Sequence, residues 1–133
     1  MRSMVVDTDV VSYIYKKDTR AALYEPHLVD AITVISFMTL AEMERWALAR
    51  NWGAKRLADM LEKVLGRFAV IESDHALCRQ WAVVTEIARR AGRKIETADA
   101  WIAATAILYG AELVTHNAAD FNFLPGLQII TES

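Results

Sequence analysis

The stretch MVVDTDVV, residues 4–11, decides the fold of this chain. Its apolar start, residues 4–6, is typical of a short buried strand. Asp7 then interrupts the apolar run, and an unpaired buried carboxylate is costly. Asp7 must therefore lie at the mouth of the strand or meet a positive charge there. We expect a helix to begin directly afterwards, with Thr8 or Asp9 near its cap.

The same alternation of strand and helix patterns continues through the chain. Further strands are expected where β-branched and apolar residues run together, at residues 32–35, 68–71, 112–115 and 128–130. Ser36 and Thr97 are expected to cap two of the helices between the strands. Helices are expected to end at Gly53, Gly66, Gly92 and Gly110. This alternation predicts an α/β fold of three layers, α/β/α, with a central, mainly parallel sheet of four or five strands.

Composition limits the classes of protein that remain. The 133 residues are 54% hydrophobic, so we expect a single folded domain over residues 1–133. The net charge of −2 gives no overall attraction to nucleic acid. Cys78 is the only cysteine, which excludes an internal disulfide and fits a reducing cytoplasm. No secretory signal or segment long enough to cross a membrane is recognisable, so we expect a cytoplasmic protein with no membrane contact.

Four acidic residues are expected near one edge of the predicted sheet. Asp7 and Asp120 follow strands, whereas Glu42 and Asp99 fall near the starts of helices. The carboxyl ends of parallel strands form the usual ligand crevice of such sheets. Two unit charges about 4 Å apart repel by about 4 kcal/mol at an effective dielectric near 20, so four converging carboxylates need a counter-charge. Mg²⁺ or Mn²⁺ would supply it, and such an ion can activate water to cut a phosphodiester.

Each acidic residue also has a simpler structural interpretation. Asp99 would complement a helix dipole, and Glu42 would be an ordinary surface residue. Asp120 would stabilise a turn, and Asp9 would cap a helix. Only Asp7, directly behind a buried strand, favours a functional role by itself.

Four segments, in this order, resemble a known family: MVVDTDVV, SFMTLAE, ETADAWIAATA and ELVTHNAADFNFLPGL. They are similar to the PIN-domain ribonucleases, and most of all to the VapC toxins of bacterial toxin–antitoxin pairs. The resemblance extends from residue 4 to about residue 130. It implies a Mg²⁺-dependent (or Mn²⁺-dependent) endoribonuclease that acts as a toxin, forms a homodimer and is inhibited by a VapB-like antitoxin.

The resemblance also implies roles for individual residues. The catalytic and metal-binding positions of the family fall on Asp7, Glu42, Asp99 and Asp120. Supporting positions fall on Asp9, where the family commonly has asparagine or serine, and on Thr115 and Asn117. Ser36 and Thr39 are expected to cap a helix and support the acids rather than act as nucleophiles. His116 departs from the arginine that is frequent in the family.

Basic residues near the acids are candidates for holding the RNA backbone. Arg89, Arg90, Arg93 and Lys94 precede Asp99, and Arg45 follows Glu42. Lys16, Lys17 and Arg20 follow the first helix in the same way. The simpler interpretation of the run at 89–94 is a solvated helix end, where cations are favourable in any case. The four tryptophans are interpreted mainly as core or dimer residues.

Two other functions fit parts of the sequence. DTDVV matches the start of an aspartate-nucleophile phosphatase of the haloacid-dehalogenase type, with Asp7 as nucleophile and Asp9 as acid. No lysine follows Lys94, however, and the AADF stretch has one acid where that family has a pair. The second alternative is an inactive PIN-like scaffold that only binds a partner or RNA; the presence of all four acids argues against it.

Overall fold

The computed structural model describes residues 2–133 and contains a five-stranded parallel sheet. The strands are β1 (Ser3–Val6), β2 (Ile32–Ser36), β3 (Ala69–Ile71), β4 (Glu112–Val114) and β5 (Ile129–Ile130). Their spatial order is β3-β2-β1-β4-β5, so β1 is central, between β2 and β4. Because every pair is parallel, the carboxyl ends of all five strands meet at one edge. The predicted three-layer α/β/α fold is confirmed.

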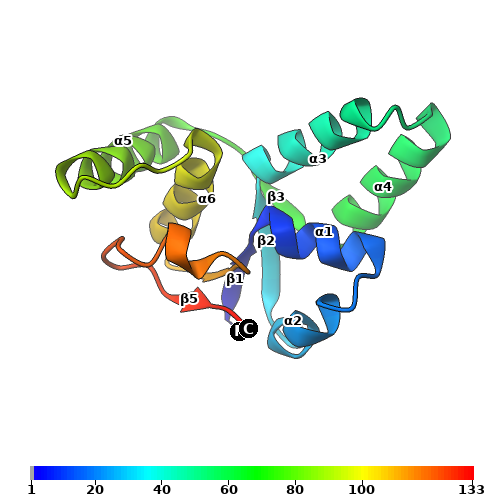
Figure 1. Ribbon diagram of the computed structural model, residues 1–133, viewed down its shortest axis with the longest axis horizontal. Coiled ribbons are helices and arrows are strands. Elements are labelled where there is room, and N and C mark those ends of the chain that lie inside the picture. Colours follow the sequence, from blue (N-terminus) through cyan, green and yellow to red (C-terminus); the bar gives the residue numbers. More distant parts are fainter. Residues whose placement is uncertain (1) are drawn as a thin grey trace.

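The helices cover both faces of this sheet. They are α1 (Thr8–Lys16), α2 (Ala21–Leu28), α3 (Phe37–Ala49), α4 (Ala54–Arg67), α5 (His75–Arg90) and α6 (Thr97–Leu108), with a short 3₁₀ helix, η1 (Ala118–Asp120). Figure 1 shows α1–α4 on one side of the strands and α5 with α6 on the other. None of the helices within residues 2–133 is long and apolar enough to cross a membrane.

The alternation of side chains along β1 divides the core in two. Met4 and Val6 pack in a cluster with residues of α1–α4, whereas Val5 packs with α5 and α6. This is the period of two that a strand buried on both faces requires. Small buried residues let α6 approach the sheet closely: Ala100, Ala103, Ala104 and Ala106. The first turn of α6, which carries Asp99, is thereby held against the carboxyl edge.

Several predicted helix ends are wrong. Helix α3 ends at Ala49, and Asn51 takes the left-handed conformation (φ 55°) that Gly53 was expected to supply. Asparagine tolerates this conformation better than most residues, so glycine is not needed there. Gly53 instead stands at the N-cap of α4, and Gly66 lies inside that helix. Gly92 and Gly110 do have positive φ just after their helices, as predicted.

Two predicted helix starts also need correction. Asp7, rather than Thr8 or Asp9, is the N-cap of α1. Thr97 is the first residue of α6, and the N-cap position is Glu96, whose side chain makes no capping hydrogen bond. The cap of α1 matters for function, because it ties a carboxylate at the end of the central strand to the backbone of the next helix.

Candidate functional site

Asp7 is fixed by groups on both sides of its carboxylate. Oδ1 accepts a hydrogen bond from the Thr8 backbone N–H (2.7 Å), and Oδ2 accepts one from Thr115 Oγ1 (2.7 Å). Thr115 directly follows β4, the neighbour of β1, and both side chains are buried. Asp7 is only 5% exposed. The carboxylate therefore has one defined orientation at the middle of the sheet's carboxyl edge.

Burial and neighbouring negative charges raise the pKa values of Asp7 and Asp99. The pKa of Asp7 is raised to about 8, first by burial and then by the negative charges of Asp9 and Asp99, against the lowering effect of its two hydrogen bonds. The pKa of Asp99 is raised to about 6, first by burial and then by Asp120 and Glu42. The charge of Asp99 thus links Asp7 to Asp120 and Glu42, and these four acids are here called the acid centre.

Glu42 reaches the acid centre through a hydroxyl. Thr8 Oγ1 lies 2.7 Å from Glu42 Oε1 and 2.9 Å from Thr39 Oγ1. Since a carboxylate only accepts, the Thr8 hydroxyl donates to Glu42 and accepts from Thr39. Thr39, predicted to support the acids, is buried in α3 one turn before Glu42. Thr8 was not predicted, although its position directly after Asp7 put a hydroxyl beside the expected site.

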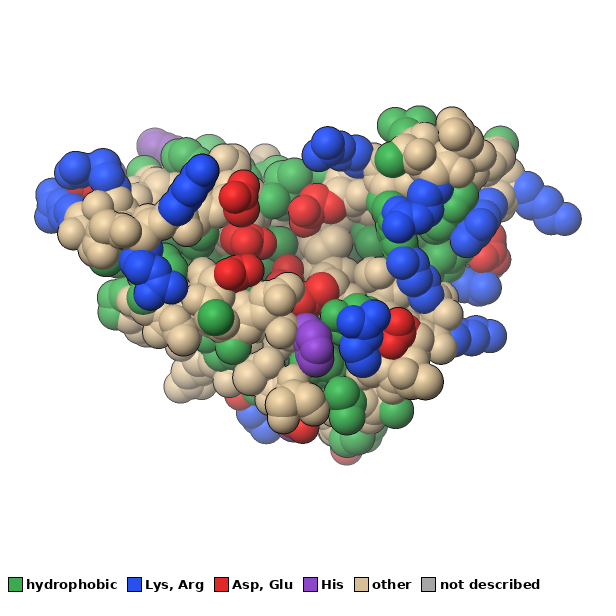
Figure 2. Space-filling model, viewed as in Figure 1, with side chains coloured by type: hydrophobic (Ala, Val, Ile, Leu, Met, Phe, Trp, Pro, Cys, Tyr) green, Lys and Arg blue, Asp and Glu red, His purple; other side chains and the backbone are tan. Residues whose placement is uncertain are grey.

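Asp99 and Asp120 line a pocket of about 280 Å³ together with Lys94, Ile95 and Glu96. Asp99 lies in the first turn of α6, and Asp120 is the last residue of η1, which follows β4. Figure 2 shows acidic side chains gathered in the hollow between the two groups of helices, with basic side chains on either flank. The hollow therefore combines a pocket wide enough for several waters with a concentration of negative charge.

Asp9 organises the loop that follows β4. Its Oδ2 accepts hydrogen bonds from the backbone N–H of His116 (3.1 Å) and from Asn117 Nδ2 (3.0 Å). Thr115 Oγ1 also accepts from the Asn117 backbone N–H (3.0 Å). Burial raises the pKa of Asp9, while its backbone hydrogen bonds lower it. Asp9, Thr115 and Asn117 are therefore brought together beside Asp7, as expected of supporting residues.

Ser36 and His116 lie near the acids, but their hydrogen bonds go to groups outside the acid centre. Ser36 is buried at the N-cap of α3, and its Oγ accepts from the Met38 backbone N–H (3.0 Å), so it fixes the start of that helix. His116 Nδ1 is hydrogen-bonded to Tyr24 Oη, and the His116 ring stands edge-on to Tyr13 and Tyr24. Sequence reasoning missed the link to Tyr24, because 92 residues separate the two side chains.

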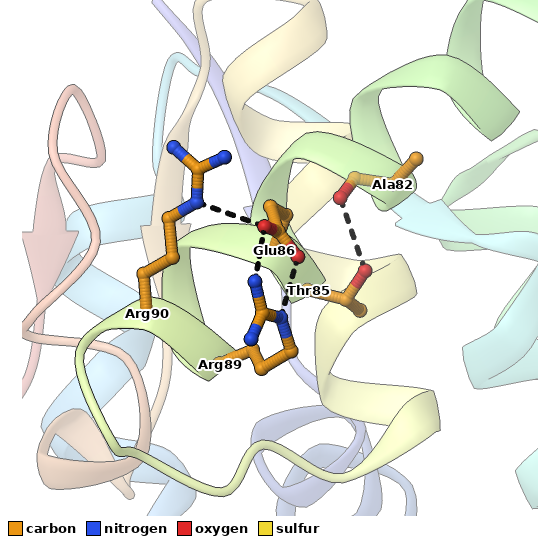
Figure 3. A network of polar contacts seen from close by, with 5 residues as sticks. All are labelled: Ala82, Thr85, Glu86, Arg89 and Arg90. Carbon is orange, nitrogen blue, oxygen red and sulfur yellow. Dashed lines mark hydrogen bonds and ion pairs between the residues drawn. The ribbon is translucent and has the colours of Figure 1, made fainter.

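The predicted RNA-binding residues differ in whether a carboxylate of the protein already pairs with them. Arg89 and Arg90 both pair with Glu86 on α5, as Figure 3 shows, and these hydrogen bonds lower the pKa of Glu86 to about 2. Arg93 donates to the Ala119 carbonyl (3.2 Å), at η1. Lys94 lines the Asp99 pocket, and Arg45 is exposed on α3. Lys94 and Arg93 therefore lie close to Asp99 and Asp120.

The donor atoms suit a hydrated divalent cation. Within residues 2–133, no three Asp, Glu, His or Cys side chains lie close enough to ligate one ion directly in this conformation. Mg²⁺, however, typically takes one or two protein carboxylates and keeps several waters. Carboxylate oxygens around a pocket wide enough for several waters meet that requirement. The same set offers neither the thiolates nor the imidazoles that softer metals prefer.

Comparison with known proteins gives a consistent result. The family model described as "PIN domain" matches residues 4–124. The chain is 28% identical over 127 residues to Ribonuclease VapC1 of Haemophilus influenzae strain R2866. The aligned region covers 93% of this chain and 93% of the relative.

Solved structures agree with these sequence matches. The chain is similar to VapBC2 from Rickettsia felis bound to a promoter DNA fragment (TM-score 0.83, 22% identity, 98% and 99% of the two chains). It is also similar to VapBC-5 of Mycobacterium tuberculosis, from the VapBC family of toxin–antitoxin systems (TM-score 0.73, 26% identity, 99% and 100%). The first of these likenesses concerns the fold alone.

Proposed function

Because this chain belongs to the PIN domain family, we propose that it is a VapC-type endoribonuclease, the toxin of a toxin–antitoxin pair. The observation that carries the proposal is the acid centre at the carboxyl edge of β1, where burial and like charge raise the pKa of Asp7 and Asp99. Relatives that match nearly the whole chain are named ribonucleases. PIN-domain ribonucleases generally depend on a divalent metal, and Mg²⁺ is the proposed ion here, with Mn²⁺ as a substitute.

The proposed roles follow from the contacts. Asp7, Glu42, Asp99 and Asp120 would hold the hydrated cation, one or two of them directly and the others through its waters. When bound, the cation supplies an activated water and charge neutralisation. Thr115 and the Thr8 N–H orient Asp7, and the Thr8 hydroxyl orients Glu42. Asp9 and Asn117 hold the loop that leads to Asp120. Arg89, Arg90, Arg93, Lys94 and Arg45 remain proposed contacts to the RNA backbone.

The proposed partners follow from the relatives. The solved structures are named as VapBC complexes, which supports a VapB-like antitoxin as the partner of this chain. A homodimer is also proposed, on the family resemblance. Cleavage of cellular RNA would take place in the cytoplasm.

The phosphatase alternative is less well supported. No lysine follows Lys94, and the stretch at residues 118–121 has one acid where that family has a pair. Trapping with beryllium fluoride would detect an aspartyl-phosphate mimic at Asp7, and none is expected. An inactive scaffold would bind RNA or a partner without cutting RNA.

The deciding experiment follows RNA integrity. The purified chain is incubated with total bacterial RNA in Mg²⁺, with excess EDTA and with the variant Asp99→Asn, and the new RNA ends are mapped. The wild type should cut only when Mg²⁺ is free, and Asp99→Asn should cut far more slowly. Equal cleavage in all three reactions, or no cleavage in any, would show that the proposed function is wrong.

A further inference from the structure

Three basic side chains lie over tryptophan rings beside the acid centre. Lys16 Nζ lies 3.9 Å and Arg50 Cζ 4.2 Å from the ring centroid of Trp46. Arg56 Cζ lies 4.0 Å from the ring centroid of Trp52. The two indole rings are neighbours, with centroids 5.6 Å apart. These five residues come from the end of α1, from α3 with its C-cap, from the loop between α3 and α4, and from the start of α4, and are here called the cation–indole strip.

The positive charge of the strip has no carboxylate partner. In the part of the chain that the structure describes, Lys16, Arg50 and Arg56 form no ion pair, and all three are exposed. Partial desolvation lowers the pKa of Lys16 and the charge of Arg50 lowers it further, although the charge of Asp18 raises it. Like charges are therefore held close together, which favours an external anion.

Other arginines of the molecule show the contrast. Arg2 pairs with Glu112, and Arg67 pairs with Glu25. Each of these charges is already neutralised by a carboxylate, so an anion gains less by binding there. The indole faces give the strip a different support, since they hold the cations in place without cancelling their charge.

The strip is joined to the acid centre through helix α3, which carries both Glu42 and Trp46. Trp46 follows Glu42 by four residues in α3 and Arg50 follows it by eight, which corresponds to about 6 Å and about 12 Å along a helix. Helix α1 runs from Asp7 at its N-cap to Lys16 at its last turn. Figure 2 shows basic side chains around exposed hydrophobic groups on the lobe of α1, α3 and α4. A bound polymer that runs from the acid centre along α3 would therefore pass over the strip.

We propose that the cation–indole strip binds the single-stranded RNA segment on one side of the cleaved bond, with phosphates on Lys16, Arg50 and Arg56. This inference rests on the proposed ribonuclease function. A guanidinium plane that lies over an indole keeps its other face open, and a base can stack on it. Binding sites for single-stranded nucleic acid combine such stacking with a row of cations. An acidic peptide would use the charges but not the planar surfaces.

The test measures RNA binding without cleavage. Every protein carries Asp99→Asn, and a fluorescent, mixed-sequence single-stranded oligoribonucleotide is titrated at several KCl concentrations. Replacing Arg50 and Arg56 by glutamine should weaken binding and reduce the slope of log K against log[salt] by about 1.4, since each phosphate contact contributes about 0.7. Replacing them by lysine should keep the slope but lower the affinity, because stacking is lost. Thermal melting checks that each variant is folded.

The matched control removes two paired arginines. Arg2→Gln with Arg67→Gln changes the net charge by the same amount and should leave the slope unchanged. Equal slopes for the two glutamine double variants would overturn the proposal. So would polyglutamate that displaces the RNA at equal charge concentration, because the site would then be a peptide site. Failure of the wild type to cut RNA tests the proposed function separately, since these binding measurements do not depend on cleavage.

Discussion

The paired strands β1 and β4 carry opposite kinds of charge arrangement at their two ends. At the amino end, Arg2 and Glu112 form an ion pair with two hydrogen bonds. At the carboxyl end, Thr115 donates a hydrogen bond to Asp7, and the charges that raise the pKa of Asp7, those of Asp9 and Asp99, are also negative. The same two strands therefore end in a neutralised pair on one side and in unbalanced charge on the other.

This difference separates stability from function. At the amino end, Arg2 and Glu112 neutralise each other within the fold, so no unpaired charge is left there to bind a ligand. The carboxyl end buries Asp7 with like charges nearby, which raises its pKa and opposes folding at neutral pH. Local conflicts of this kind are expected at functional sites. The four predictions below test the contrast between the two ends.

The largest effect is expected from Asp7→Asn. RNA cleavage in Mg²⁺ should fall by at least about 100-fold, because metal-assisted catalysis supplies several kcal/mol and 1.36 kcal/mol corresponds to a factor of ten. Initial rates of RNA cleavage measure the loss. The matched control is Asp30→Asn, since Asp30 is exposed with φ 63°, a conformation that asparagine accepts. A similar loss in both variants would contradict the special role of Asp7.

The second prediction concerns pH in the absence of divalent ions. The folded-state pKa values of Asp7 and Asp99, about 8 and about 6, lie above the ordinary value of 3.8. The folded chain therefore binds protons more tightly than the unfolded chain, so this contribution to stability is full below about pH 4 and is lost as the pH rises through 6 and 8. The Tm in EDTA should fall over that range.

The variants and the ion itself check this explanation. The double variant Asp7→Asn with Asp99→Asn should show a much weaker fall in Tm between the same pH values. Adding Mg²⁺ to the wild type should raise the Tm most at high pH, where the acids are ionised. If the wild type and the double variant have parallel Tm profiles in EDTA, then other groups control the pH dependence.

A smaller effect is expected from Thr115→Val. The change removes the donor to Asp7 and the acceptor for the Asn117 N–H, so unfolding free energy should fall by about 1–3 kcal/mol. Cleavage should slow by about 10–100-fold, the usual cost of losing a group that orients a metal ligand. Urea denaturation and initial rates measure the two effects. Thr33→Val is the control, since the Thr33 hydroxyl makes only a 3.5 Å contact; full activity in Thr115→Val would refute the orienting role.

The smallest effect is expected at the opposite end of the strands. Arg2→Gln breaks the ion pair with Glu112, but Arg2 is well exposed, so unfolding free energy should fall by less than about 1 kcal/mol. RNA cleavage should not change. Urea denaturation at low and high salt measures the loss, which should shrink as salt increases. A change in the cleavage rate would mean that the two ends are coupled through the sheet.

Much of this arrangement was predictable because it follows from topology. In parallel sheets all strands end at one edge, so Asp7 and Asp120, which each follow a strand, could both be assigned to that edge. Small apolar residues follow Asp99 at helical spacing, Ala103 and Ala106 among them, and such a face is typical of a helix that packs closely on a sheet. These inferences need only the period of each element and its position in the chain.

The contacts that depend on packing between helices were not predictable. The hydrogen bond from Thr8 to Glu42 joins residues 34 positions apart. It forms only if α1 and α3 pack so that the first turn of α1 meets Glu42 on α3. The cation–indole strip likewise needs the ends of three helices to meet. By contrast, the pairing of Glu86 with Arg89 and Arg90 follows from helical spacing.

The distance between the four acids along the sequence has a consequence for the timing of synthesis. Asp7 leaves the ribosome first and Asp120 last, and β5, which pairs with β4, comes later still. At about 5–20 residues per second, translation from the first acid to the last takes roughly 6–23 s. During that interval the nascent polypeptide cannot complete the acid centre. A nuclease site assembled in this way stays incomplete until the residues up to Asp120 have been translated.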